Sequence, residues 1–178
     1  MRTIAILTQR AVEAGLSFVV IGAHAVAAHG FSRATTDLDI ITDKAQRPGW
    51  VALLTSLGYK QSQDGGTFLQ FTAPEPDQWD VDVLLTDEAT FTKFRSAAIK
   101  AVIADTAVWV PALDHLLALK LHALKNGNAA RFLKDLEDII NLIVANKVDV
   151  QGSSFKQLME KFGTPELYEK IARLSERS

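Results

Sequence analysis

Two patterns of apolar and polar positions follow each other along the chain, and the change between them falls near Pro111. Before that point, short apolar runs typical of strands are interspersed with segments whose apolar residues recur at helical spacing. We expect helices over residues 3–14, 23–30, 48–57 and 87–98. We expect strands over residues 17–21, 37–41, 59–63, 67–71, 79–85, 101–103 and 107–110.

After Pro111 the pattern is helical, with helices expected over 112–125, 129–146, 154–162 and 165–176 and a break at 126–128. The tripeptide Gly163-Thr164-Pro165 supplies a C-terminal glycine, an N-cap and a first-turn proline between the last two helices. The pattern therefore predicts an α+β (α/β) chain. Residues 1–110 would form a mixed β-sheet with flanking helices, and residues 111–178 a C-terminal helical region packed on it.

Composition narrows the class of protein. The 178 residues are 48% apolar, which is enough for a compact core, and the absence of cysteine excludes disulfides and thiolate metal sites. The net charge of −2, with no run of Lys or Arg, disfavours binding through many nucleic-acid phosphates. Because no apolar run could cross a membrane and no signal-peptide pattern is present, we expect a cytoplasmic protein.

Two acidic residues share one face of the strand over 37–41. Side chains two apart point the same way, so Asp37 and Asp39 lie side by side while Leu38 and Ile40 face a core. Neighbouring carboxylates repel each other unless one is protonated or a cation lies between them. Mg²⁺, which binds one or two carboxylates together with substrate phosphates, fits such a pair. The alternative is a strand end whose acids point into water.

A second acidic pair, Asp80 and Asp82, follows the same alternation in the strand over 79–85. Burial of Asp82 between Val81 and Val83 without a partner would be costly. Asp80 could equally lie in solvent at the end of the strand. The two pairs could converge on one site.

These residues carry a resemblance. An apolar residue, Gly22, a small residue and the later Asp37-Leu38-Asp39-Ile40 resemble the signature of the DNA-polymerase-β-type nucleotidyltransferase superfamily. Within it, the run from Gly22-Ala23 to Asp37-Leu38-Asp39 is similar to the abortive-infection (AbiEii-type) toxins and related small prokaryotic nucleotidyltransferases. The resemblance implies two Mg²⁺ ions bound by Asp37, Asp39 and a third carboxylate, best matched by Asp82. Asp82 would also activate the attacking hydroxyl.

The turn and loop before these acids supply candidate phosphate contacts. Gly22 and Ala23 stand between a strand and a helix N-terminus, where backbone N–H groups can bind phosphate. The family normally has Gly or Ser at Ala23, and alanine cannot supply the hydroxyl. Arg33 could bind a phosphate or pair with Asp37 or Asp39. Thr36 belongs to the same polar loop.

Lys120 lies in the apolar stripe of its predicted helix, with Leu113, Leu117 and Leu124. It either extends its charge to solvent or needs an anion there. On the next helix, simple salt bridges would join Arg131 to Asp135 and Lys134 to Asp138. The resemblance instead places Lys120 and an acid of this block in the active site, and we carry this over to Lys120, Asp135 and Asp138.

The resemblance implies an enzyme that transfers a nucleotidyl group from a nucleoside triphosphate to a hydroxyl of an RNA or protein acceptor and releases pyrophosphate. The biological role that it implies is the toxin of a toxin–antitoxin pair, with an antitoxin as partner. Two alternatives stay open. One is a non-catalytic antitoxin or nucleotide sensor, favoured by Ala23, and the other is a metal-dependent phosphohydrolase.

Overall fold

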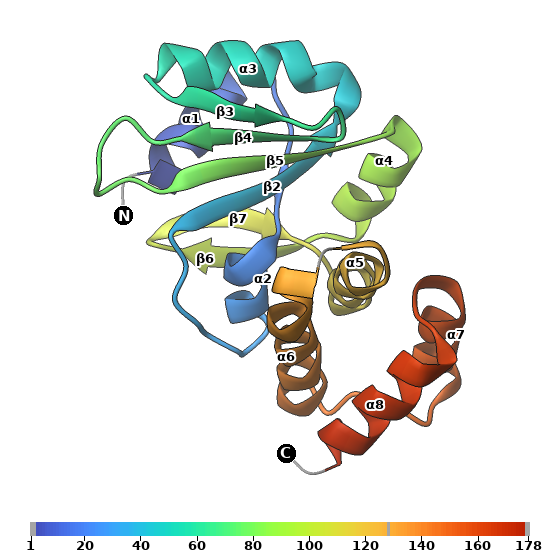
Figure 1. Ribbon diagram of the computed structural model, residues 1–178. Helices are drawn as coiled ribbons and strands as arrows, with labels where there is room; N and C mark the ends of the chain where they lie inside the picture. The colour runs from blue at the N-terminus through green and yellow to red at the C-terminus, as the bar shows by residue number, and fades with distance from the viewer. Residues whose placement is uncertain (1–2, 128, 177–178) are drawn as a thin grey trace. The chain divides into compact units, whose positions relative to one another are not determined.

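The computed structural model describes residues 3–127 and 129–176, so Asn128, part of the predicted break at 126–128, lies outside the described residues. The chain forms two compact units (Figure 1). The first contains residues up to Ala28 and from Ser32 to Ala112, and the second contains His29–Phe31 and the chain from Leu113. Within the described ranges, no helix is long and apolar enough to cross a membrane.

The first unit contains every helix and strand expected before Pro111. Its helices are α1 (Thr3–Glu13), α2 (Gly22–Ala28), α3 (Arg47–Ser56) and α4 (Glu88–Ala97), with a 3₁₀ turn over Lys44–Gln46. Its strands are β1 (Val19–Val20), β2 (Asp37–Asp43), β3 (Lys60–Asp64), β4 (Phe68–Thr72), β5 (Asp80–Thr86), β6 (Ile99–Ile103) and β7 (Thr106–Val110). The strand predicted over 17–21 is shorter than expected, because only two of its residues pair with β2.

Five strands form a mixed sheet in the order β1-β2-β5-β4-β3. The central strands β2 and β5 are parallel, whereas the other neighbours are antiparallel. Strands β6 and β7 form a separate hairpin. This arrangement confirms the predicted mixed sheet with flanking helices.

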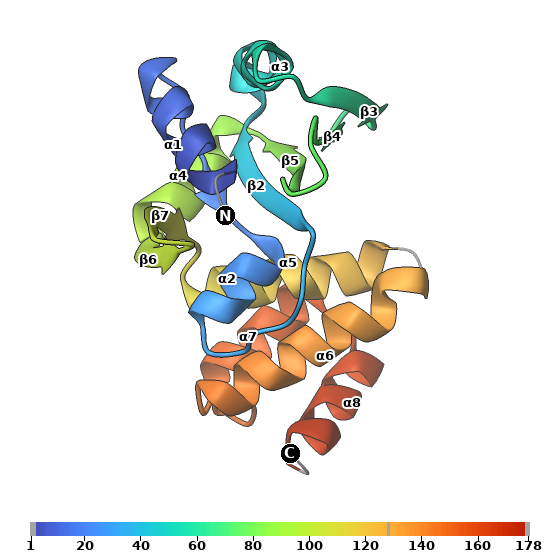
Figure 2. The ribbon, with the colours of Figure 1, turned by 90° about the vertical axis from the view of Figure 1, so that its left-hand side faces the viewer.

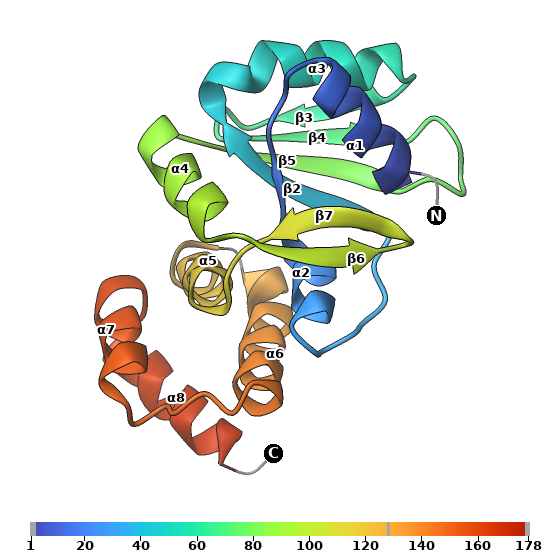
Figure 3. The same ribbon diagram turned by 180° about the vertical axis from the view of Figure 1, so that it is seen from behind.

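The period-two pattern of the central strands gives the sheet two different faces. Leu38 and Ile40 on β2, and Val81 and Val83 on β5, are fully buried. Helix α1, which buries Ile4, Leu7 and Ala11, lies across one face of the sheet in the view of Figure 3. The intervening acids are half-buried and belong to the opposite face, so the local alternation alone separates the core from the acidic positions.

The second unit is helical, as predicted, and its helices can be followed in Figure 2. They are α5 (Leu113–Asn126), α6 (Ala129–Ala145), α7 (Ser153–Phe162) and α8 (Pro165–Ser175). Thr164 caps α8 through its Oγ1, which accepts a hydrogen bond from the Leu167 N–H, with Pro165 in the first turn. Gly163 ends α7, as expected, and its backbone there is extended, with a φ of −106°. Asn146 Nδ2 donates to the His29 carbonyl at 2.8 Å, which ties the 29–31 segment to this unit.

Candidate active site

Four carboxylates form two opposed pairs on the central strands of the sheet. In the parallel register of β2 and β5, Asp37 lies opposite Asp80 and Asp39 lies opposite Asp82. Neighbouring strands are about 4.8 Å apart, and side chains at paired positions point to the same face. The tertiary structure therefore brings Asp37, Asp39 and Asp82 together as neighbours on one face, as the two acidic pairs suggested.

Each acid has different surroundings. Both carboxylate oxygens of Asp82 accept hydrogen bonds from Nε2 of Gln70, at 3.3 and 3.1 Å. Asp80 Oδ1 accepts from the Ala73 backbone N–H at 2.8 Å, so Asp80 holds the loop that precedes its own strand. Asp37 Oδ1 accepts from the hydroxyl of Thr36 at 3.0 Å. Asp80 therefore has a structural bond, and Asp82 is held by a side chain.

Gly22 lies directly against the carboxylate of Asp39. Its φ is +62°, and a Cβ added there would stand 1.9 Å from Asp39 Oδ2, so no larger residue fits without displacing that carboxylate. The Ile21 backbone N–H donates to the Asp39 carbonyl at 2.9 Å and extends the pairing of β1 with β2 to the turn. Ala23, by contrast, is only 2% exposed, so its side chain belongs to the core.

His24 packs against Trp79 and lies near Asp37. Its ring centroid is 4.3 Å from that of Trp79, and its buried Nε2 has no hydrogen-bond partner among the described residues. Burial lowers the pKa of His24, the Asp37 carbonyl opposes that shift, and the charge of half-buried Arg33 adds to it. His24 is therefore favoured as a neutral ring between Trp79 and the backbone of Asp37.

The carboxylate oxygens of Asp37, Asp39 and Asp82 are ligands that suit a hard cation such as Mg²⁺. No group of three His, Asp or Glu side chains within residues 3–127 and 129–176 is arranged to hold a metal ion by itself. Mg²⁺, however, is usually bound by one or two carboxylates together with substrate phosphates and water. Asp39 and Asp82, half-buried and opposed on neighbouring strands, meet that requirement, with Asp37 next to Asp39 on the same face.

The second unit contains a buried ion cluster. Nζ of Lys120 on α5 lies 2.7 Å from Asp135 Oδ1 and 2.7 Å from Asp138 Oδ2 on α6. Lys120 is 7% exposed, Asp135 5% and Asp138 0%, so extension of the lysine to solvent is excluded. The anion that the sequence required for Lys120 is this pair of acids. The structure thus joins three predicted residues within the helical unit.

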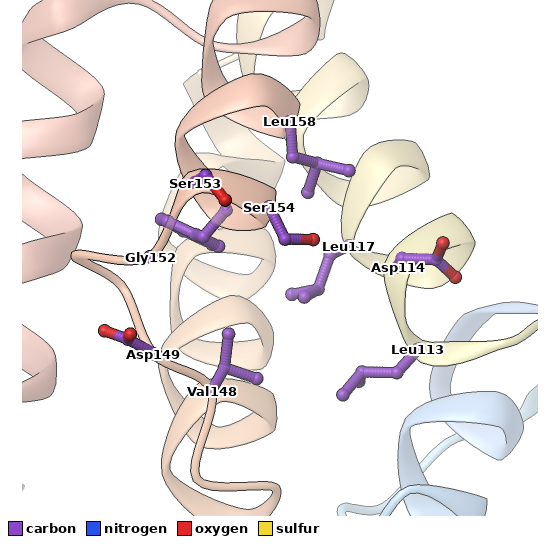
Figure 4. Close-up of a pocket in the computed structure, with 10 residues that line it drawn as sticks. Leu113, Asp114, Leu117, Val148, Asp149, Gly152, Ser153, Ser154 and Leu158 are labelled. Carbon is purple, nitrogen blue, oxygen red and sulfur yellow. The ribbon is translucent and has the colours of Figure 1, made fainter.

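A pocket of about 500 Å³ also lies in the helical unit. Figure 4 shows apolar side chains from α5, α7 and the loop between α6 and α7 around it, among them Leu117, Val148 and Leu158. Asp114 and Asp149 add two carboxylates to its lining. As far as the described residues show, its lining includes none of the predicted site residues.

Gln70 is the residue of this region that the sequence interpretation missed. The signal was present, because Gln70 interrupts an apolar strand between Leu69 and Phe71, which are buried. The position of Gln70 shows that its side chain points away from the face of Leu69 and Phe71. It does not, however, show which side chain on a neighbouring strand Gln70 contacts. That partner depended on the pairing of β4 with β5, which places Gln70 opposite Asp82.

Comparison with known proteins supports the fold. The sequence matches no protein-family model and no curated protein. The solution structure of the antibiotic-resistance factor ANT(2″)-Ia is similar, with a TM-score of 0.69 and 14% identity over 98% of this chain and 96% of that one. The lincosamide antibiotic adenylyltransferase LnuA, bound to lincomycin, gives a TM-score of 0.56 and 12% identity over 78% and 93%.

An antigenic nucleotidyltransferase-like protein from Paracoccidioides brasiliensis is similar over 95% of this chain and 90% of that one, with a TM-score of 0.54 and 17% identity. At these identities the likeness concerns the fold and not the chemistry. It agrees with the observed mixed sheet and helical unit. The chain therefore has the nucleotidyltransferase-like fold.

Proposed function

We propose that this protein is a metal-dependent nucleotidyltransferase, which transfers a nucleotidyl group from a nucleoside triphosphate to an acceptor hydroxyl. The observation that carries the proposal is the register of Asp39 opposite Asp82, with Gly22 packed against the Asp39 carboxylate. The nucleotidyltransferase-like fold adds support, because the structural neighbours include a protein described as an adenylyltransferase.

In the proposed reaction, Asp37, Asp39 and Asp82 would hold two Mg²⁺ ions together with substrate phosphates, and Asp82 would accept the proton of the attacking hydroxyl. The acceptor oxygen forms a bond to the α-phosphorus, the bond from that phosphorus to the bridging oxygen of the β-phosphate breaks, and pyrophosphate leaves. When bound, Mg²⁺ would stabilise negative charge on the attacking and leaving oxygens. Asp39 and Asp82 are suited to binding the metal because the pairing of their strands fixes the distance between them.

The proposal assigns substrate contacts to Gly22, Ala23, Arg33 and Thr36 in the first unit. Ala23 would contribute only its backbone N–H, since its side chain is buried. For Lys120, Asp135 and Asp138, which form the buried ion cluster of the second unit, the resemblance implies a role in the active site. The two carboxylates account for two of the three N–H donors of the ammonium group.

The acceptor in this proposal is an RNA, a protein or a small molecule that carries a hydroxyl. An RNA or protein acceptor, and a role as toxin beside an antitoxin, follow from the resemblance of the Gly22 to Asp39 segment. The small-molecule class follows from the structural neighbours, since ANT(2″)-Ia has been observed with adenylyl-2″-tobramycin and LnuA with lincomycin.

The test begins with calorimetric titration of each nucleoside triphosphate, with and without Mg²⁺, into wild type and Asp39→Asn. We expect Mg²⁺-dependent binding that Asp39→Asn abolishes. Asp43→Asn is the matched control, because Asp43 ends the same strand but caps the following 3₁₀ turn through the Ala45 N–H. Absence of triphosphate binding to folded wild type would overturn the proposal.

The nucleotides that bind are then supplied with an α-phosphate label to RNA, protein and small-molecule acceptors. Label on an acceptor together with released pyrophosphate is the expected result. A non-catalytic nucleotide-binding module is the second candidate, because Ala23 buries a methyl group where the resembling family can carry a hydroxyl. It would bind the nucleotide without transferring label, and a phosphohydrolase would release inorganic phosphate.

A further inference from the structure

We propose that Gln70 is a positioning residue, which orients the carboxylate of Asp82 for metal binding. The inference rests on the proposed function, because it gives Gln70 a part in the same site. It starts from a contact that the sequence did not indicate. Gln70 Nε2 lies 3.3 Å from Asp82 Oδ1 and 3.1 Å from Oδ2, so one amide group spans both oxygens.

The chemistry of the two groups fixes the direction of these hydrogen bonds. An ionised carboxylate only accepts, and a glutamine amide offers its donors on the nitrogen, so Nε2 faces Asp82. Because the amide nitrogen reaches both oxygens, Gln70 restricts the rotation of the Asp82 carboxylate and holds it in one orientation, which prepares it to bind a cation.

The backbone makes Gln70 a rigid support. Its strand β4 is paired on both sides, so that Gln70 lies opposite Gln63 of β3 and opposite Asp82 of β5. Its chain neighbours Leu69 and Phe71 are 0% and 1% exposed, which anchors the strand in the core. A contact between side chains on two anchored strands needs little ordering when a ligand arrives.

The competing interpretation is a purely structural cross-strand pair. Such pairs contribute about 0.2–1 kcal/mol to sheet stability and have no necessary effect on a ligand. Residues that orient a metal-binding side chain behave differently, because their loss typically lowers metal affinity or activity by about 10- to 100-fold. Metal affinity and thermal stability, measured on the same variants, therefore separate the two interpretations.

The experiment measures binding of Mn²⁺ alone, as a paramagnetic substitute for Mg²⁺, by electron paramagnetic resonance. Gln70→Leu removes the donor at similar size, and Gln70→Asn keeps the amide on a side chain one methylene shorter. Gln63→Leu is the matched control, because it makes the same change at the exposed position opposite Gln70 on β3. Asp39→Asn reports on the metal site itself, and circular dichroism melting curves establish that each variant is folded.

We expect Gln70→Leu and Gln70→Asn to weaken Mn²⁺ binding by about 10- to 100-fold, with Gln63→Leu within about twofold of wild type. The proposal is overturned, while the proposed function stands, if both Gln70 variants bind like wild type and Asp39→Asn does not bind. If the Gln70 variants melt at a lower temperature but bind Mn²⁺ as tightly as wild type, the proposal is likewise overturned. If wild type and Asp39→Asn are alike in showing no binding, the metal site of the proposed function fails, and the inference fails with it.

Discussion

Asp39 and Asp82 lie directly opposite each other on the parallel strands β2 and β5. Two half-buried carboxylates at this spacing destabilise the protein when no cation separates them, because like charges repel in a medium of reduced dielectric constant. The cost of holding them together is offset when a divalent cation binds. Stability should therefore respond to Mg²⁺ through this pair.

The first prediction concerns Asp39→Asn. The variant removes one of the two opposed carboxylate charges at nearly constant shape, so we expect it to lose the response of stability to Mg²⁺. With Mg²⁺ at 100 times its dissociation constant, wild type should gain about 2.7 kcal/mol of unfolding free energy, and the variant should gain none. Urea unfolding with and without Mg²⁺ measures both quantities. Equal stabilisation of the variant would show that the cation binds elsewhere.

The second prediction concerns Gly22→Ala, with Gly15→Ala as the matched control. Both glycines have positive φ, +62° and +67°, so each substitution should cost about 1–2 kcal/mol for the left-handed backbone. A Cβ at Gly15 meets nothing within 4 Å, whereas at Gly22 it overlaps the Asp39 carboxylate. Gly22→Ala should therefore cost a further 1–3 kcal/mol, roughly, and weaken metal binding.

Chemical unfolding and Mn²⁺ titration of these two variants test that expectation. The same loss of stability in both, with unchanged Mn²⁺ affinity, would mean that the turn tolerates a methyl group and that Asp39 has room to move.

The third prediction concerns Lys120→Met. Removing the ammonium leaves Asp135 and Asp138 buried without their shared cation, which should cost about 3–5 kcal/mol. Lys125→Met, an exposed position on the same helix, should change stability by less than about 0.5 kcal/mol. Adding Asp138→Asn to Lys120→Met should recover part of the loss by removing one of the two buried negative charges. Denaturant titration measures all three, and a nearly neutral Lys120→Met would refute the buried cluster.

The fourth prediction is a loss of stability at alkaline pH through Tyr59. Burial raises the pKa of Tyr59 above its ordinary value of 10.0, a hydrogen bond with Thr3 opposes the shift, and the charge of Asp80 adds to it. Below pH 10 both folded and unfolded states keep the proton. Above it the unfolded state loses the proton first, so stability falls as pH rises from 10 toward the raised pKa.

Tyr59→Phe should lack this component of the alkaline loss. At neutral pH it should cost about 1 kcal/mol, because the hydroxyl no longer donates to the Trp79 carbonyl. Unfolding midpoints of wild type and variant between pH 8 and 11 test the difference, since lysine titration affects both proteins alike. Parallel curves over this range would contradict the prediction.

The sequence by itself determined the helices and strands and the two faces of the central strands. Alternation placed Asp37 with Asp39, and Asp80 with Asp82, because the side-chain period of a strand is local and needs no partner. The stripe of α5 likewise showed that Lys120 lies among apolar side chains. Each of these features depends on residues within a few positions of one another.

Only the tertiary structure decided which strands are neighbours and in which register. A shift of one residue between β2 and β5 would separate Asp39 from Asp82, and that register depends on how whole strands pack, not on any local pattern. The same holds for Gln70 beside Asp82 and for the two acids around Lys120. The convergence of the two acidic pairs could be expected from the sequence, but the register that pairs them, and Gln70 as a partner of Asp82, depend on long-range strand pairing and could not.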